Sequence, residues 1–400
     1  MNSHPDWRPS DASERIRVID ILRGLALFGV LIVNILSGFR VPMMWHIRGH
    51  FAGLRGIDYL VELLASLTLE FKALSVFSFL FGVGMAIQTE RAGRRNAGPR
   101  HFLFRRLAWL LVLGVAHLLL VWNGDILTLY AICGLFFLPL ISAPWQVLLV
   151  LGAAFITAPQ FVGFGFDLPS GTAATDAIAQ ARQIYGNEGF VAILRFRWHE
   201  TSTLIAPLLV SVLPRTVGLI YWGASAWRSG ILSAPEKHRG MLTAVLVIGG
   251  VIGGAVTAND VWTASSGTAP LPMLNGIHLD AAAVLAMAYV AALLLWLNSC
   301  PPSRFPRLAS LGQMALTNYL VQSVVLGFVF YGYGFGLFGR IGSAASAGIG
   351  VVLYLTQLQL SRYWLQRFRF GPVEWLWRSL AYGRRQPMRQ GPTDRRMEQS

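Results

Sequence analysis

The chain has 400 residues, of which 54% are hydrophobic and only 13% are charged. A soluble domain needs about 25% charged residues to cover its surface, so much of this surface faces something other than water. The formal net charge of +14 comes almost entirely from arginine, because Lys72 and Lys237 are the only lysines. The arginines cluster between apolar runs, as topology signals do in membrane proteins, and this distribution argues against a nucleic-acid partner.

Apolar runs divide most of the chain into candidate membrane spans. A hydrocarbon core of ~30 Å needs about 20 apolar residues in a helix. Such runs occur at residues 20–39, 60–88, 105–122, 125–141, 145–163, 203–227, 241–258, 276–298, 308–330 and 341–361. The sequence therefore predicts an all-α, polytopic integral membrane helical bundle of about ten transmembrane helices over residues 20–361. Residues 1–19 form a tail before it, and residues 362–400 form an amphipathic, interfacial segment and a basic tail.

The distribution of Lys and Arg predicts the orientation. One set of tails and loops holds 23 of these residues, and the opposite set holds seven. Because cytoplasmic segments carry the excess, both termini are predicted to lie in the cytoplasm, which requires an even number of spans. The largest loop, residues 163–201, then faces the periplasm, where we expect short interfacial helices.

The first span carries a dense set of polar residues: Asp20, Arg23 and Asn34. Asp20 and Arg23 are three residues apart, so they share a helix face and can pair. Asn34 follows Arg23 by three turns, or ~16 Å along the axis, on the same face. An ionisable group inside a membrane costs at least ~2.5–3.5 kcal/mol, so it needs a partner or a function. These three residues either form a site that binds substrate, or they are structural. In the structural alternative, Asp20 and Arg23 form an ion pair at the cytoplasmic edge of the membrane and Asn34 packs against other helices.

Three further groups of polar residues lie in apolar runs. Glu70, in the second run, has no partner on its own helix face and is a candidate for a polar cavity. His117 and Asp125 flank a tight turn, where Asp125 is expected to cap the returning helix. His117 is a residue type suited to proton transfer, although a buried His is most often a hydrogen-bonded packing residue. Asn318 and Gln322 share a face, and they either line a cavity or form interhelical hydrogen bonds.

His46 and His50, in the first loop, have the i, i+4 spacing of metal ligands on a helix. No Cys or neighbouring carboxylate completes such a site, so no metal is expected.

Several segments together resemble a known family: residues 17–34, 77–84, 105–130, 314–323, 331–339 and 371–378. They are similar to the bacterial YeiB-like inner-membrane family, catalogued as domain of unknown function 418. The resemblance covers nearly the whole chain and implies a location in the bacterial inner membrane.

The family is distantly similar to transmembrane acyltransferases, which take acyl-CoA on the cytoplasmic side and modify a sugar on the far side. This resemblance implies that Arg23 floors a donor cavity. The O-acyltransferases carry a catalytic His where this chain has Asn34. The N-acetyltransferases have an Asn there and a His in the following loop, where His46 is similarly placed.

Two functions of different classes follow. As an acyltransferase, the protein would use acyl-CoA, such as acetyl-CoA, with His46 or His117 as the general base toward a sugar or lipid hydroxyl or amine. As a transporter, it would use Asp20, Glu70 and His117 as proton or substrate sites. A non-catalytic membrane scaffold is the third alternative. The expected partners are membrane lipids, a small-molecule, glycan or lipid substrate, and a second copy in a homodimer.

Overall fold

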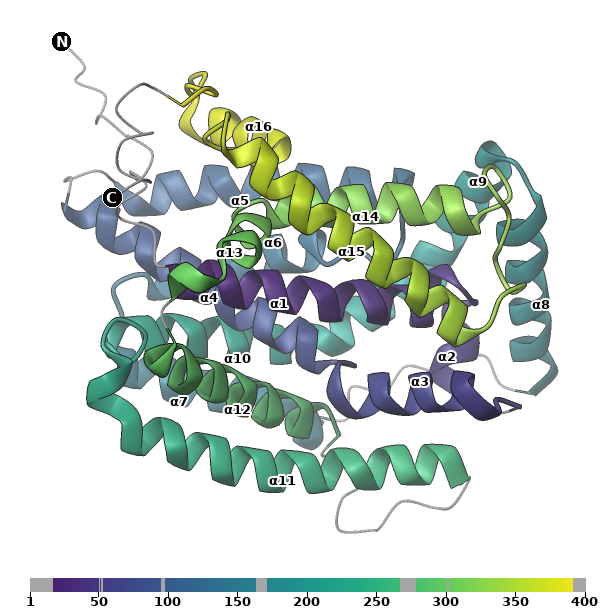
Figure 1. Ribbon diagram of the computed structural model, residues 1–400, viewed down its shortest axis with the longest axis horizontal. Helices are drawn as coiled ribbons and strands as arrows, with labels where there is room; N and C mark the ends of the chain where they lie inside the picture. Colours follow the sequence, from purple (N-terminus) through teal and green to yellow (C-terminus); the bar gives the residue numbers. More distant parts are fainter. Residues whose placement is uncertain are drawn as a thin grey trace.

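The computed structural model describes residues 17–49, 51, 53–94, 98–162, 171–266, 278–300 and 302–390. Within these ranges the chain is helical, apart from loops and one isolated β-bridge between Phe368 and Arg389. Most of the long helices run along one common direction, and α8 (Gly171–Asn187) lies across one end of the bundle (Figure 1). The predicted all-α helical bundle is therefore confirmed.

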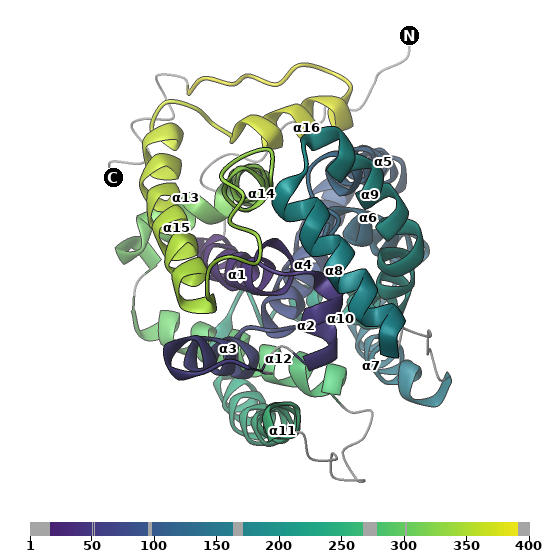
Figure 2. The same ribbon diagram turned by 90° about the vertical axis from the view of Figure 1, so that its right-hand side faces the viewer.

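The first predicted span forms α1 (Arg17–Asn34), which lies in the middle of the bundle (Figures 1 and 2). Its apolar residues are buried on almost every side, as expected for a helix enclosed by other helices. The helix widens into a π-helical turn, Ile35–Phe39, before the short α2 (Met43–Gly49).

The second predicted span is interrupted. It consists of α3 (Gly56–Thr68) and α4 (Lys72–Arg94), and Phe71 between them has a φ of 58°. This left-handed conformation costs an L-residue roughly 1–2 kcal/mol, so the surrounding structure must stabilise the break.

The next three helices are α5 (Pro99–Leu120), α6 (Leu127–Leu135) and α7 (Trp145–Val162). A 3₁₀ turn, Leu138–Leu140, extends α6. The α5 and α6 helices pack closely because Gly114 has no side chain: a Cβ there would lie 2.5 Å from the backbone nitrogen of Thr128.

The predicted periplasmic loop, residues 163–201, contains two helices, α8 and α9 (Phe190–Glu200). They stand at the end of the bundle where α1 finishes (Figure 1). A π-helical turn, Thr201–Ile205, leads into α10 (Ala206–Arg228), which has Pro214 inside it.

The second half of the chain begins with a hairpin of α11 (Arg239–Ser266) and α12 (His278–Ser299), preceded by the 3₁₀ turn Pro235–His238. Another 3₁₀ turn, Pro302–Arg304, follows α12. The predicted ninth span is two helices, α13 (Pro306–Gln313) and α14 (Ala315–Phe330), which meet at 80°. The last helices are α15 (Ser343–Leu365) and α16 (Pro372–Tyr382).

Among the described residues, six helical runs are long and apolar enough to cross a membrane, or seven if the bent pair α13–α14 is one span. Several such helices identify a multi-pass membrane protein. The number of ten crossings stays a prediction. The segment predicted at 125–141 shows the reason, because α6 has nine residues and is only ~14 Å long.

Candidate functional site

Arg23 of α1 lines a cavity inside the helical bundle. Arg23 forms the predicted ion pair with Asp20, with Nη1 3.3 Å from Oδ1. The guanidinium reaches toward α4 at Gly84, where a Cβ would lie 3.2 Å from Nη2. A glycine at this position therefore leaves room for the arginine.

We call the space beside Arg23 the arginine cavity. It has a volume of about 170 Å³. Three arginines from three different helices line it: Arg23 of α1, Arg106 of α5 and Arg378 of α16. Aromatic and amide side chains also line it: Tyr130, Tyr319, Trp377, Gln88 and Gln313.

The charges around this cavity favour an anion. Arg106 lies close enough to Arg23 and Arg378 for their positive charges to repel it. Its guanidinium carbon lies 3.7 Å from the centre of the Trp377 ring, and Trp377 Nε1 donates to the carbonyl oxygen of Arg106 at 2.9 Å. Within the described chain, no carboxylate forms an ion pair with Arg106. Converging guanidinium groups suit a phosphate or a carboxylate.

Glu374 also lines the arginine cavity, but its carboxylate is already hydrogen-bonded. Oε1 accepts from the backbone nitrogen of Thr317 at 3.0 Å, and Oε2 accepts from the hydroxyl of the same residue. Burial raises the pKa of Glu374, and these hydrogen bonds oppose the shift. The carboxylate thus anchors α16 to α14.

His117 and Asp125 form a buried pair beyond the far end of the cavity. Nδ1 of His117 lies 2.8 Å from Oδ1 of Asp125, and Oδ2 of Asp125 accepts from the backbone nitrogen of Thr128 at 2.6 Å. The predicted capping role of Asp125 is confirmed, and the carboxylate also orients His117. Nε2 of His117 is buried and has no hydrogen-bond partner in the described part of the chain.

The pair connects to the arginine cavity through Tyr319. The rings of His117 and Tyr319 are 5.2 Å apart between centroids, and Tyr319 lines the cavity. One face of α5 continues from the cavity to the pair, because its cavity residues Leu103, Arg106, Leu107 and Leu110 are followed at helical spacing by Gly114 and His117.

A second polar layer lies next to this pair, toward α8 and α9. Glu200 Oε2 accepts from Asn123 Nδ2 at 2.5 Å and from the Tyr185 hydroxyl at 2.6 Å. Burial raises the pKa of Glu200. Arg197 is fully buried nearby, with Nε and Nη2 lacking partners among the described residues. Sequence reasoning missed Arg197 and Glu200 because they lie in a segment interpreted as a loop.

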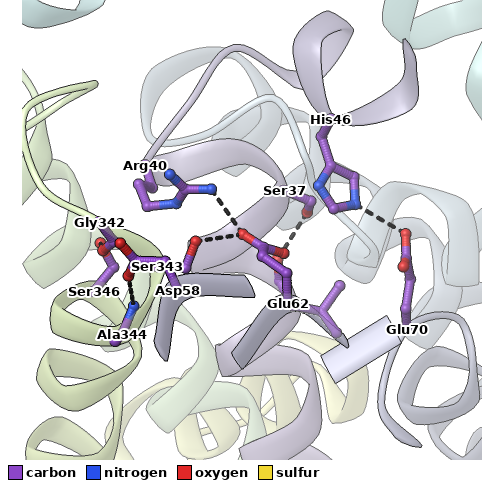
Figure 3. Close-up of polar contacts among 11 residues, drawn as sticks. Ser37, Arg40, His46, Asp58, Glu62, Glu70, Gly342, Ser343, Ala344 and Ser346 are labelled. Carbon is purple, nitrogen blue, oxygen red and sulfur yellow. Dashed lines mark hydrogen bonds and ion pairs between the residues drawn. The ribbon is translucent and has the colours of Figure 1, made fainter. Parts of the chain in front are cut away.

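The other predicted histidine, His46, lies in a different polar cluster (Figure 3). Its Nε2 is 2.9 Å from Oε1 of Glu70, so the predicted need of Glu70 for a partner outside its helix is met by α2. Neither residue lines the arginine cavity. His50 lies outside the described residues, and no group of three His, Cys, Asp or Glu within the described ranges could hold a metal.

Beside this pair, Arg40 and Glu62 form a buried ion pair, with Nη2 2.7 Å from Oε1 (Figure 3). The Ser343 hydroxyl donates to the same carboxylate oxygen at 2.7 Å. Burial lowers the pKa of Arg40, and Glu62 opposes that shift. These contacts join the loop after α1 to α3 and α15, which is a structural role.

The remaining predicted residues do not line the arginine cavity. Asn34 is half-buried at the end of α1. Asn318 donates to the Ser361 hydroxyl at 2.9 Å, and Gln322 donates to Oε1 of Gln357 at 2.8 Å. These two side chains connect α14 to α15, which matches the interhelical alternative.

Comparison with known proteins places the chain in a family. Residues 226–384 match the family model described as "Protein of unknown function (DUF418)". The chain is 33% identical to the uncharacterized protein YxaH of Bacillus subtilis, over 95% of this chain and 98% of that protein. It is 28% identical to an uncharacterized 39.9 kDa protein in the amylase 3' region of Bacillus acidopullulyticus, over 95% and 97% of the two chains. The uncharacterized protein YeiB of Escherichia coli is 29% identical over 92% of this chain and 96% of its own length. The chain therefore belongs to the DUF418 family, is similar to YeiB, and has the helices of a multi-pass membrane protein.

Proposed function

We propose that this protein is a transmembrane acyltransferase that takes its acyl group from acyl-CoA and transfers it to a hydroxyl or amine of a sugar or lipid. The observation that carries the proposal is the His117–Asp125 pair, whose imidazole packs on a tyrosine of the arginine cavity. A base held by a carboxylate next to an anion-attracting cavity supports acyl transfer better than a packing role.

The arginine cavity fits one part of the donor. Arg23, Arg106 and Arg378 would hold phosphate oxygens, and the aromatic lining would hold the apolar arm. A volume of about 170 Å³ admits a phosphate or a slender chain, so the remainder of CoA would lie outside. Acyl-CoA bound there would supply an acyl group activated as a thioester.

His117 is the general base of this proposal. Asp125 holds the Nδ1–H, which leaves the lone pair on Nε2. Nε2 takes the proton of the acceptor hydroxyl or amine as the new acyl bond forms, and returns it to the departing thiolate. Such proton transfer typically contributes 10²–10⁴-fold to a rate.

The proposed location is the bacterial inner membrane with both termini in the cytoplasm. The 23-to-seven distribution of Lys and Arg supports it, as does the position of Arg23 and Arg106 near the first residues of α1 and α5. The acceptor would approach from the opposite side, past α8 and α9.

The test is to incubate the purified protein in lipid nanodiscs with radiolabelled acetyl-CoA and to measure hydrolysis and transfer. His117→Ala should abolish turnover, whereas His101→Ala, at an exposed position on the same helix, should leave it unchanged. Absence of label, hydrolysis and transfer from a folded protein would contradict the proposal.

Transport is the second candidate, and the irregular helices favour it. Transporters use discontinuous helices at their binding sites, and here the chain breaks at Phe71 and bends by 80° between α13 and α14. Solute flux into proteoliposomes that disappears in Asp20→Asn would support transport over acyl transfer. A folded protein with neither activity would leave the scaffold alternative.

A further inference from the structure

An apolar groove lies between the α11–α12 hairpin and the helices α7 and α10. It has a volume of about 630 Å³ and is lined by α7 and α10 on one side and by α11 and α12 on the other. The α11 helix lies at the outside of the bundle (Figures 1 and 2) and packs mainly on α12. This arrangement leaves the groove open. Gly249 and Gly253 allow this close packing, because a Cβ at either would meet the backbone of α12.

The walls of the groove offer almost no polar surface. Trp222 Nε1 donates to the carbonyl oxygen of Leu149 at 3.1 Å, and the Ser225 hydroxyl donates to that of Trp145 at 2.9 Å. These polar groups are therefore already satisfied by the backbone. What remains for an occupant is aliphatic surface, such as Val245, Met287 and Leu294.

The length of the groove corresponds to one leaflet. Its lining begins at His238 and reaches Gly249 along α11. Eleven residues of helix rise ~16 Å, which is about half of a hydrocarbon core of ~30 Å. With His238 at the membrane surface, the groove would reach the middle of the bilayer, which is the reach of one acyl chain.

The mouth of the groove is basic. Lys237 and Arg239 are exposed on either side of His238, which is half-buried and lines the groove. Glu236 is the neighbouring acid, so this short turn keeps a net positive charge. Cationic side chains at the depth of the headgroups attract anionic lipids.

We propose that this groove is a specific site for one anionic phospholipid, with an acyl chain between α10 and α11–α12 and the phosphate at Lys237, His238 and Arg239. The site lies outside the arginine cavity and does not depend on acyl transfer.

The test compares two matched variants by native mass spectrometry of detergent-solubilised protein with added phosphatidylglycerol or phosphatidylcholine. Ala244→Trp fills the groove, whereas Ala255→Trp places the same side chain on an exposed part of α11 outside it. Wild type and Ala255→Trp should retain one phosphatidylglycerol, and Ala244→Trp should lose it. Equal retention by Ala244→Trp would overturn the site.

The headgroup assignment has its own measurement. The double variant Lys237→Gln, Arg239→Gln changes only exposed side chains, and it should still bind one lipid but no longer prefer phosphatidylglycerol to phosphatidylcholine. An undiminished preference for phosphatidylglycerol would overturn the basic mouth as the phosphate site.

Discussion

Arg215 of α10 donates a hydrogen bond from Nη2 to the carbonyl oxygen of Phe71, 2.7 Å away, at the residue where the chain breaks between α3 and α4. The same nitrogen also donates to the Ser75 hydroxyl. A charged side chain from a helix far away in the sequence thus donates a hydrogen bond to the backbone at the break between α3 and α4.

Replacing this arginine should destabilise the break. Arg215→Met keeps the apolar stem and removes the donor, so we expect a loss of about 1.5–3 kcal/mol in the free energy of unfolding, typical of a hydrogen bond to a charged group. Unfolding followed by tryptophan fluorescence in detergent micelles measures it. Arg100→Met, at an exposed position at the start of α5, controls for loss of charge alone and should leave the free energy of unfolding unchanged.

Phe71→Gly should act in the opposite direction. Glycine adopts a positive φ without the penalty of an L-residue, and Phe71 is 41% exposed, so less burial is lost than at a core phenylalanine. We expect a stabilisation of about 1 kcal/mol. A decrease in the free energy of unfolding would contradict this prediction. It would show that the contacts of the phenyl ring stabilise the fold by more than the backbone strain destabilises it.

The close approach of α1 and α13 should make Gly312 intolerant of any side chain. A Cβ at this position would lie 1.8 Å from the backbone oxygen of Asp20, and backbone cannot yield as a flexible side chain does. Gly312→Ala should cost about 1–3 kcal/mol or prevent folding. Gly93→Ala, with nothing within 4 Å, is the matched control and should be neutral or stabilising. Similar yields of folded protein from both would contradict the packing.

The two roles of Asp125 can be separated by one pair of substitutions. Asp125→Ala removes the cap on Thr128 and should cost about 0.5–2 kcal/mol. Asp125→Ser restores a capping oxygen but cannot hold Nδ1 of His117 in the same way. We therefore expect Asp125→Ser to recover most of the stability and none of the acyl transfer. Recovery of both would assign Asp125 to structure alone.

Glu374 should make stability depend on pH. Its pKa in the folded protein is raised by burial, so the folded state binds a proton more tightly than the unfolded state. The raised pKa therefore favours folding at low pH. This stabilisation is lost as the pH rises from the pKa of an unfolded Glu, about 4.3, through the pKa of Glu374 in the folded protein. Glu374→Gln should flatten the fall in stability as the pH rises above about 4.3. An unchanged slope in urea unfolding would exclude Glu374 as its source.

The spacing of residues in the sequence predicted the contacts that form within one helix or across one turn. The Asp20–Arg23 pair follows from an interval of three residues, and the capping by Asp125 follows from its place at the start of a helix. Both are set by geometry over a few residues, which a sequence shows directly.

The arginine cavity was not predictable in that way. In the sequence, the basic cluster that ends at Arg106 suits CoA phosphates and an orientation signal equally well, and residues 362–400 suit an interfacial segment and a basic tail. The structure instead packs α16 on α5 and α14, with Trp377 buried and stacked on Arg106. Nothing in the sequence relates residues so far apart, and only tertiary packing brings their charges together.

The first and last helices of the described chain both contribute to this cavity, and that sets an order of events during synthesis. Arg23 emerges from the ribosome more than 350 residues before Arg378. Until α16 is made, α1 can hold Asp20 and Arg23 together, but the pocket has neither its third arginine nor the indole of Trp377. A nascent chain therefore has the complete arginine cavity only after α16 has been synthesised.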